Sequence, residues 1–334
     1  MNQKTKLFLN LILSFVVFFI IIYVTGIDKI LEVLATVKLE FVLLALLVYV
    51  LVNLLMSTRI KIVLDSFGDK LTSSQIFPSN LAGMLASDFT PARIGYFFTA
   101  FSLSSRFKLP LEKTMIAIFG PQLFDFLIKV TSASILFVFL VDKLGAGNIL
   151  VNIVVLLFVL IGVIGAGLAV FYPPFLNYFK FFEKFPFVPT IFAFLRKMHL
   201  HSEKVLSVKW PVIGVTFLSW FFKSLEWFIL AKALSISIFD DLLLDLGFMM
   251  IFQAAITIIH FLPIPTLAGA GASEAGFAAI LVVFGIPLAT SITFGFLTRF
   301  IMIAVDIFSL PVLTGYLQTH NLEKSLGTLT KFKH

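Results

Sequence analysis

Long apolar runs constrain this chain more than any other feature, because each is about as long as a lipid bilayer is thick. A helix that crosses the hydrocarbon core needs about 20 predominantly apolar residues. Six runs approach that length and are expected to be spanning helices: Leu7–Thr25, Leu39–Met56, Leu111–Val141, Ile149–Phe171, Pro211–Leu234 and Leu288–Tyr316. Two lysines precede the first run as in a signal peptide. Its apolar part is too long for a signal peptide and no small-residue cleavage site follows it. We therefore expect this run to stay uncleaved as the first transmembrane helix.

The composition supports this membrane assignment and removes several other classes. Hydrophobic residues make up 60% of the chain and charged residues 13%, against about a quarter charged in average proteins. The net charge of +7 is expected in cytoplasmic loops or at anionic headgroups. Nucleic-acid binding is not expected, since no soluble module is long enough for it. The chain has no cysteine and only scattered histidines, so neither a metal site nor a cofactor is predicted.

Two further apolar regions, 76–105 and 242–285, are interrupted by polar, glycine- and proline-containing stretches. These read SDFTPARIG at 87–95 and IPTLAGAGASEAG at 264–276. Non-helical backbone at membrane depth persists only where it is buried in protein or lines a polar cavity. We therefore expect two re-entrant helical hairpins, each with a cavity at its tip. In an alternative topology, 242–262 spans fully and 272–285 is a separate span.

The loops and an internal repeat indicate the topology. Placing the basic loops inside, with Arg59 counted in the loop after the second span, puts both termini in the cytoplasm of a cell-membrane protein. Span, hairpin and span occur twice with opposite sidedness, so we predict an all-α polytopic membrane protein built as an inverted-repeat helical bundle. The expected divisions are a transmembrane domain over 1–320, halves over 39–141 and 211–316, an amphipathic cytoplasmic linker over 172–210 and a cytoplasmic tail over 321–334.

Ionisable residues inside the apolar segments are the first site candidates, because each costs about 2.5–3.5 kcal/mol to insert. Two pairs, Asp125–Lys129 and Lys223–Glu226, have the spacing of neighbours on one helix face, and they are either structural or line a pathway. The other candidates lie at the two tips or in the last span: Asp88, Arg93, Glu274, Arg299 and Asp306.

The tips have the chemistry of an anion site. A broken helix presents free N–H groups and the positive end of its dipole, and Arg93 adds a donor fork suited to phosphate. Glu274 either caps the next helix or holds a cationic or hydroxyl-rich headgroup. The sequence therefore predicts a site for lipids with polar or phosphorylated headgroups. Further members of this expected substrate site are Pro91, Gly95, Gln122, Pro263, Pro265, Gly269 and Gly271.

The function expected from these features is lipid translocation. The chain contains no G-x-x-x-x-G-K-[ST], H-E-x-x-H or G-x-S-x-G motif, so ATP-driven transport in cis and enzymatic activity are not predicted. The alternatives are a membrane-embedded lipid-modifying enzyme and an accessory subunit of a glycosyltransferase.

Two motifs resemble those of the lysylphosphatidylglycerol synthase/flippase transmembrane family. TPARIG at 90–95 resembles its T-P-x-R-x-G-[ED] signature, and LPIPTLAGAGASEAGF at 262–277 resembles its second, glycine-rich signature. Asp125 looks like the aspartate of its R-x-x-D element, and Arg299 like an arginine late in its domain. The resemblance covers about residues 5–320. It implies a polytopic domain that moves charged or glycosylated lipids between leaflets, in some relatives beside glycosyltransferases.

The chain departs from that family pattern at two positions. Tyr96 stands where an acidic residue is usual, and Gln122 stands where arginine usually precedes Asp125. An arginine–carboxylate link is therefore expected to be missing here, and headgroup specificity does not carry over. The soluble aminoacyl-transferase domain of some relatives is not in this sequence, so lipid aminoacylation is not expected of it.

Overall fold

The computed structural model is helical throughout the part that it describes, which is residues 15–145 apart from 18, residues 157 and 161, and residues 177–184, 202–260 and 271–319. No strand occurs among these residues. The elements are α2 Ile27–Ala35, α3 Leu39–Ser66, α4 Ser73–Asp88, η1 Pro91–Tyr96, α5 Phe97–Phe107, α6 Leu111–Phe119, α7 Gln122–Lys143, η2 Lys180–Lys184, α11 Ser202–Ser207, α12 Lys209–Ala233, α13 Leu242–His260, α14 Ala272–Val283, α15 Leu288–Asp306, η4 Ile307–Ser309 and α16 Leu310–Thr319.

Four of the expected spans are confirmed within the described residues. The segments long and apolar enough to cross a membrane are Leu39–Ser66, Leu111–Lys143, Lys209–Ala233 and Leu288–Tyr316. The expected span over 149–171 lies outside the described residues, apart from two isolated positions, and the first expected span is described, as helix, only from Phe15. The protein is thus a multi-pass α-helical membrane protein.

Helix α3 shows how the membrane environment shapes these helices. A stripe of exposed leucines runs along one side at helical spacing, formed by Leu39, Leu43, Leu47, Leu51 and Leu54. Polar side chains are buried on another side, namely Tyr49, Asn53 and Ser57. A soluble helix has the opposite arrangement, with its apolar stripe facing the core. The outer face of α3 is therefore suited to lipid, and its inner face to a polar interior.

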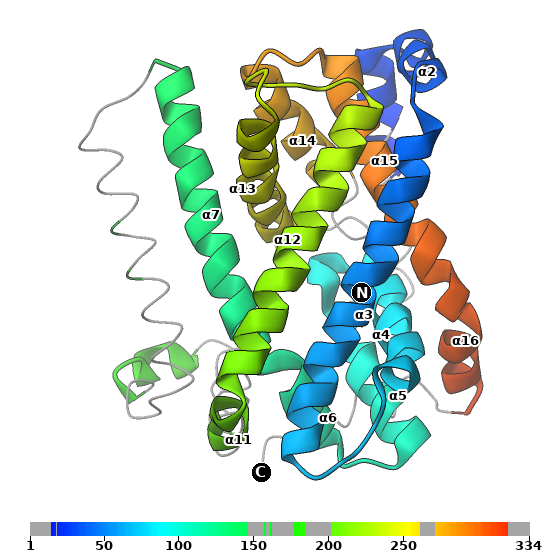
Figure 1. The fold of residues 1–334 in the computed structure, drawn as a ribbon, viewed down its shortest axis with the longest axis vertical. Coiled ribbons are helices and arrows are strands. Elements are labelled where there is room, and N and C mark those ends of the chain that lie inside the picture. The colour runs from blue at the N-terminus through cyan, green and yellow to red at the C-terminus, as the bar shows by residue number, and fades with distance from the viewer. Residues whose placement is uncertain are drawn as a thin grey trace.

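The broken regions occupy opposite ends of the bundle. Helices α3 and α12 pack along each other through the middle of the molecule, while α4, α5 and α6 lie near its lower end and α13 and α14 near its upper end (Figure 1). Helix α4 stops at Asp88, and the 3₁₀ turn η1 separates it from α5, which packs back against it. Residues 261–270, between α13 and α14, lie outside the described residues. The inverted repeat and the re-entrant course of both regions stay predictions.

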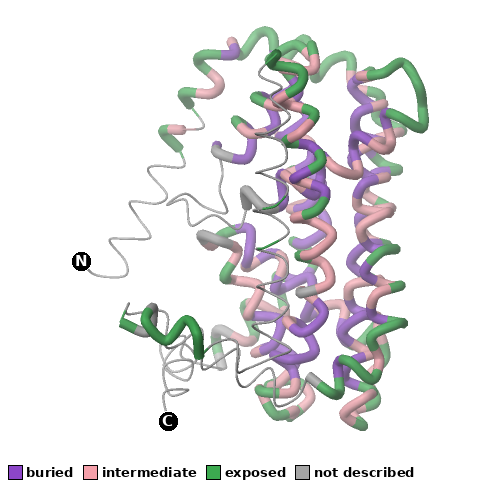
Figure 2. Tube along the Cα trace, turned by 90° about the vertical axis from the view of Figure 1, so that its left-hand side faces the viewer, coloured by how far each residue is buried: buried purple, intermediate pink, exposed green. Residues whose placement is uncertain are grey.

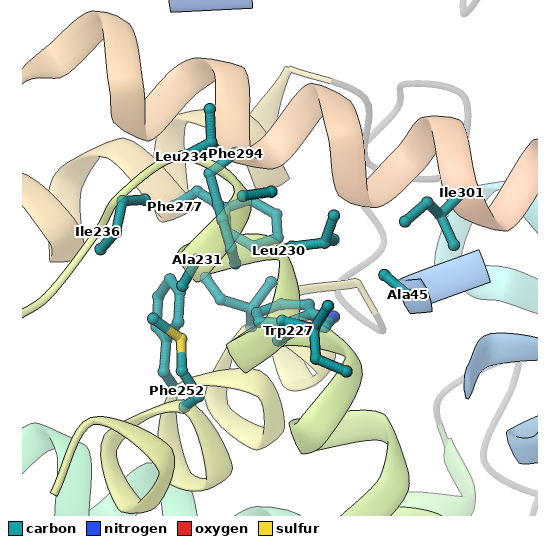
Figure 3. Close-up of a cluster of buried hydrophobic side chains, with 14 of the residues drawn as sticks. Ala45, Trp227, Leu230, Ala231, Leu234, Ile236, Phe252, Phe277, Phe294 and Ile301 are labelled. Atoms are coloured by element: carbon teal, nitrogen blue, oxygen red, sulfur yellow. The ribbon is translucent and has the colours of Figure 1, made fainter. Parts of the chain in front are cut away.

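Buried residues run through the length of the bundle, and exposed residues cluster on its outer faces and turns (Figure 2). Four elements meet in an aromatic core in which Trp227 of α12 contacts Phe252, Phe277 and Phe294 at ring-centroid distances of 5.4, 4.9 and 5.7 Å (Figure 3). Such ring pairs contribute about 0.5–1.5 kcal/mol beyond their buried area. Because Phe277 and Phe294 belong to α14 and α15, packing in this core fixes the relative position of the two helices that carry Glu274 and Arg299.

One loop assignment is wrong. Arg59 belongs to α3, which continues past Met56 to Ser66, and only 2% of Arg59 is exposed. The apolar run ends before the helix does, because the last turns of α3 carry polar side chains. Ser57 and Arg59 among them are buried, whereas Lys61 and Asp65 form an exposed ion pair. The amphipathic linker expected over 172–210 is described only at 177–184 and from 202 onward, and the tail over 321–334 lies outside the described residues.

Candidate functional site

The first tip is a compact turn in which Thr90, Pro91 and Gly95 of TPARIG each have a structural role. The Thr90 hydroxyl donates to the carbonyl of Ala86 and accepts from the N–H of Gly95 at 2.7 Å. Pro91 begins η1, where its missing N–H costs nothing. A Cβ on Gly95 would lie 2.2 Å from the carbonyl oxygen of Ala86, so only glycine lets η1 lie this close to α4.

This turn directs Arg93 back toward the end of α4. Arg93 has a φ of 54°, in the left-handed region, and its Nη2 donates to Asp88 Oδ1 at 2.9 Å. The two side chains are 13% and 3% exposed. Asp88 Oδ2 and Arg93 Nε are buried and have no hydrogen-bond partner among the described residues. Each side chain therefore has one polar atom that no described protein group satisfies.

The second tip presents a matching ion pair. Gly271, with a φ of 85°, precedes α14, and its N–H donates to Glu274 Oε2 at 2.7 Å. The other carboxylate oxygen accepts from Arg299 Nε at 2.7 Å. Arg299 Nη2 also donates to the Ser273 hydroxyl at 2.9 Å. Glu274 thus caps α14, which is one of the two roles expected for it, and also pairs with Arg299, whose side chain is 23% exposed. Its expected contact with a headgroup stays a prediction.

Both tips line one cavity. Its volume is about 20 Å³, room for about one water molecule, within about 290 Å³ of space that includes its open mouth. Its lining residues are Asp88, Arg93, Ser273, Glu274, Phe277, Gly295, Thr298, Arg299 and Met302. Two arginines and two carboxylates therefore face a single space although they come from halves of the chain almost two hundred residues apart. Phe277 and Met302 supply an apolar wall.

Five lining residues were not predicted from the sequence: Ser273, Phe277, Gly295, Thr298 and Met302. A usable signal was present, because 295, 298, 299 and 302 recur at three- and four-residue spacing and therefore share a helix face with Arg299. Gly295 allows α14 to approach, since a Cβ there would lie 3.1 Å from the Phe277 ring and 3.4 Å from Glu274 Cγ.

A second polar cluster lies apart from the cavity lining. The Tyr49 hydroxyl donates to Asp306 Oδ2 at 3.0 Å, across α3 and the end of α15. Lys223 pairs with Glu226 at 2.7 Å and lies 4.4 Å from the centroid of the Tyr49 ring. Asp306 and Glu226 are fully buried. Of the expected site residues on the last span, the structure thus brings Arg299 to the cavity and Asp306 to this cluster.

A third cluster forms where α7 begins. Lys129 pairs with Asp125 at 2.6 Å. With the Gln122 amide turned so that both of its ends are satisfied, its nitrogen donates to Asp125 Oδ2 at 3.0 Å and its oxygen accepts from Arg59 at 3.3 Å. The chain thus brings an arginine toward Asp125 from α3. The missing arginine at position 122 is replaced by an indirect link.

The remaining expected site residues are not all visible. Pro263, Pro265 and Gly269 lie outside the described residues, and of Pro91 only the backbone is described. Within the described ranges no group of histidine, aspartate and glutamate side chains is arranged to hold a metal ion.

The fold and this cavity define a polytopic α-helical membrane protein with a charged interior site. The chain belongs to the family described as lysylphosphatidylglycerol synthase TM region, whose match covers residues 7–308. A Methanocaldococcus jannaschii protein named UPF0104 membrane protein is 32% identical over 108 residues, which are 32% of this chain and 32% of that protein. The match therefore spans about a third of that curated relative's length. No solved structure matches the chain.

Proposed function

We propose that this protein moves a lipid with a polar, phosphate-bearing headgroup between the leaflets of the cell membrane. The observation that carries the proposal is that two arginine–carboxylate pairs from distant parts of the chain line one cavity. Asp88 and Arg93 come from the first helix break, whereas Glu274 follows the second break and pairs with Arg299 of α15. Broken helices facing a shared site near the bilayer midplane are a recurring feature of membrane transporters. The family match supports a transmembrane domain of this kind.

The paired charges suit a headgroup that carries both phosphate and donor groups. An arginine guanidinium binds phosphate through two parallel hydrogen bonds. A phosphate entering the cavity would take the free Nε of Arg93, while the free Oδ2 of Asp88 would accept from an ammonium or hydroxyl of the headgroup. Because each arginine already has a carboxylate partner, the empty cavity is close to neutral, which lowers the cost of keeping these charges in the membrane.

The lipid tail would stay in the bilayer while the headgroup passes between the tips. In this proposal, α4, η1 and α5 enter from the cytoplasmic face and α13 and α14 from the opposite face, in the inverted arrangement predicted from the sequence. The exposed leucine stripe on α3 provides an apolar outer surface along which acyl chains can pack. Alternating movement of the two halves would then open the cavity to one leaflet at a time.

The test is translocation of fluorescently labelled phosphatidylglycerol in vesicles that contain the purified protein. Accessibility of the label to a membrane-impermeant quencher reports movement from the inner leaflet. The informative variant is Asp88→Asn with Arg93→Gln, because it removes both charges of one pair and leaves no unpaired buried charge. We expect translocation to fall at least tenfold.

The matched control removes another acid–base pair that lies outside the cavity. Lys61 and Asp65 form an exposed ion pair on α3, so Lys61→Gln with Asp65→Asn should keep wild-type translocation. Equal rates in both double variants would refute the proposed site. Mass spectrometry of the vesicle lipid separates transport from enzymatic modification, since a transporter leaves the lipid mass unchanged.

A further inference from the structure

Arg59 is a buried arginine without a carboxylate partner in the described structure. It lies on α3 with 2% of its surface exposed. Its Nη1 donates to the Thr216 hydroxyl at 3.5 Å, its Nη2 reaches the Gln122 amide oxygen at 3.3 Å, and its buried Nε has no partner. No described acidic side chain lies within ion-pair distance of it. Because a guanidinium stays protonated in proteins, this is an uncompensated charge inside the membrane region.

The nearest acidic group does not neutralise it directly. Asp125 contacts Arg59 only through the Gln122 amide, and it already pairs with Lys129 at 2.6 Å. The Asp125–Lys129 pair is close to neutral as a unit. A positive charge in excess therefore remains at Arg59.

The helix next to Arg59 adds to that excess. Gln122 is the first residue of α7, a helix of 22 residues whose N-terminus has no side-chain cap. The N-terminal end of a helix carries partial positive charge and favours anions, whereas a cation there is unfavourable. The Arg59 guanidinium nevertheless lies beside this end of α7, because its Nη2 contacts the Gln122 amide oxygen. Asp125, in the first turn of α7, offsets part of this helix charge. The buried arginine with its unpartnered Nε is joined to the start of α7 through Gln122, and an anion bound there would neutralise the arginine.

We propose that Arg59, Gln122 and the N-terminus of α7 form a second phosphate-binding position, separate from the cavity. None of these residues lines the cavity. Gln122 is only partly buried, and the side chains of Asp125 and Lys129 are 17% and 13% exposed, so the position lies close to the surface of the bundle. The Gln122 amide can turn to donate to an incoming phosphate oxygen while Arg59 binds the others.

Tyr96 connects this position to the cavity. It lies three residues after Arg93 in η1, which is one turn of a 3₁₀ helix, and it is within electrostatic reach of both Arg59 and Arg93. Its hydroxyl donates to the Asn80 side chain at 3.2 Å. If the protein moves lipids as proposed above, on which this role depends, the headgroup phosphate would bind first at Arg59 and then pass Tyr96 to Arg93.

The test measures anion binding directly and needs no transport. The purified full chain carrying Asp88→Asn and Arg93→Gln, which disables half of the cavity, is titrated with inorganic phosphate and separately with short-chain phosphatidylglycerol. Calorimetry gives the affinity of each. We expect binding of at least one probe, weakened about tenfold or more by Arg59→Gln, with Arg59→Lys intermediate because it keeps the charge and loses the fork. Lys61→Gln, two residues away on the exposed face, should bind as its parent does.

The possible outcomes distinguish free phosphate from a lipid headgroup as the ligand. They also distinguish failure of this binding position from failure of the proposed function. Binding of phosphate alone assigns a site for the free ion, binding of the lipid assigns a headgroup site, and both support the position at Arg59. Affinities unchanged by Arg59→Gln would overturn it. The proposal would also be overturned if neither probe bound and Arg59→Gln lowered the thermal unfolding midpoint. Arg59 would then serve only to balance the charge of Asp125. Loss of translocation has no part in these readouts, so failure of the proposed function is recognised separately.

Discussion

Arg299 reaches from α15 to Glu274 on α14 and donates its Nε to the carboxylate at 2.7 Å, while the other oxygen of that carboxylate caps the start of α14. One side chain therefore closes a helix end and neutralises an arginine in the same cavity. Deleting the Glu274 side chain therefore removes the cap of α14 and the partner of Arg299 at the same time.

This coupling predicts strong non-additivity between the two residues. Removing one partner of a buried pair costs about 3–5 kcal/mol, because the remaining charge is left unpaired. Glu274→Gln and Arg299→Gln should each lower the thermal unfolding midpoint in detergent markedly, and the double variant should be less destabilised than the sum of the two. Additive losses would show that the pair does not interact across α14 and α15.

Gly95→Ala should destabilise the first tip. The new Cβ would lie 2.2 Å from the Ala86 carbonyl oxygen, and relieving such overlap costs about 1–3 kcal/mol. Thermal unfolding in detergent measures the loss. Gly214→Ala on α12 is the matched control, since nothing lies within 4 Å of its added Cβ, and alanine favours a helix interior by about 0.5–1 kcal/mol. Equal stability of the two variants would contradict the close approach of η1 to α4.

Tyr49→Phe should destabilise the protein by leaving Asp306 without its hydroxyl donor. The Tyr49–Asp306 hydrogen bond of 3.0 Å is buried, and an orphaned buried polar group costs about 1–3 kcal/mol. Adding Asp306→Leu to that variant should recover stability, because both polar partners are then gone. A double variant that unfolds more easily than Tyr49→Phe alone would mean that Asp306 has another essential contact.

The hydrogen bonds of the Asp245 carboxylate predict that the stability of the folded protein falls at acid pH. It lies in the first turn of α13, outside the four candidate spans, and accepts from the Ser237 hydroxyl at 2.6 Å, the Ile238 N–H at 2.9 Å and Lys232 at 2.9 Å. Burial opposes ionisation, but these hydrogen bonds outweigh it and lower the pKa of Asp245 to about 2.

Since the unfolded-state pKa of aspartate is about 3.9, this stabilisation is complete above that pH and is lost as the pH falls through about 2. Asp245→Asn should therefore lower the unfolding midpoint at pH 6 and have little effect near pH 2. A difference from wild type that stays constant over this range would show that the Asp245 carboxylate contributes no ionisation-linked stability.

The cavity should be accessible to water. The chain has no natural cysteine, so one introduced thiol is a clean reporter. Thr298→Cys, in the cavity lining, should react with a small charged thiol reagent in membranes. Phe252→Cys, in the aromatic core with no exposed surface, should not react. A Thr298→Cys thiol as inert as that control would mean that the cavity is closed to solvent.

Much of the helical framework follows from local sequence. The spans expected at 39–56 and 211–234 are visible as apolar runs, because a lipid-facing segment is recognised from its own residues alone. The structure places helices over both, at Leu39–Ser66 and Lys209–Ala233. The break at 87–95 is visible because proline and glycine act on the backbone where they stand. The ion pairs Asp125–Lys129 and Lys223–Glu226 follow from helical spacing alone, and the structure confirms both.

Arg59 shows where such local inference fails. Its apolar run ends at Met56, so the sequence places it in a loop, whereas the helix continues and buries it beside α7 and α12. Hydropathy reports contact with lipid and is silent about polar groups that face a protein interior. The cavity residues Gly295 and Thr298 were not predicted either, because small and hydroxyl-bearing side chains are common on any membrane helix.

The order of residues along the chain is enough to identify a multi-pass helical membrane protein, to locate four of its long helices and to find the charges at its breaks. The folded arrangement was needed to find that Arg93 and Arg299 face one cavity and that Arg59 contacts Gln122 at the start of α7. This division arises because helix formation and membrane insertion depend on residues within a few turns of one another. The meeting of charges from distant helices depends on side-chain packing, such as that around Trp227, which no local pattern specifies.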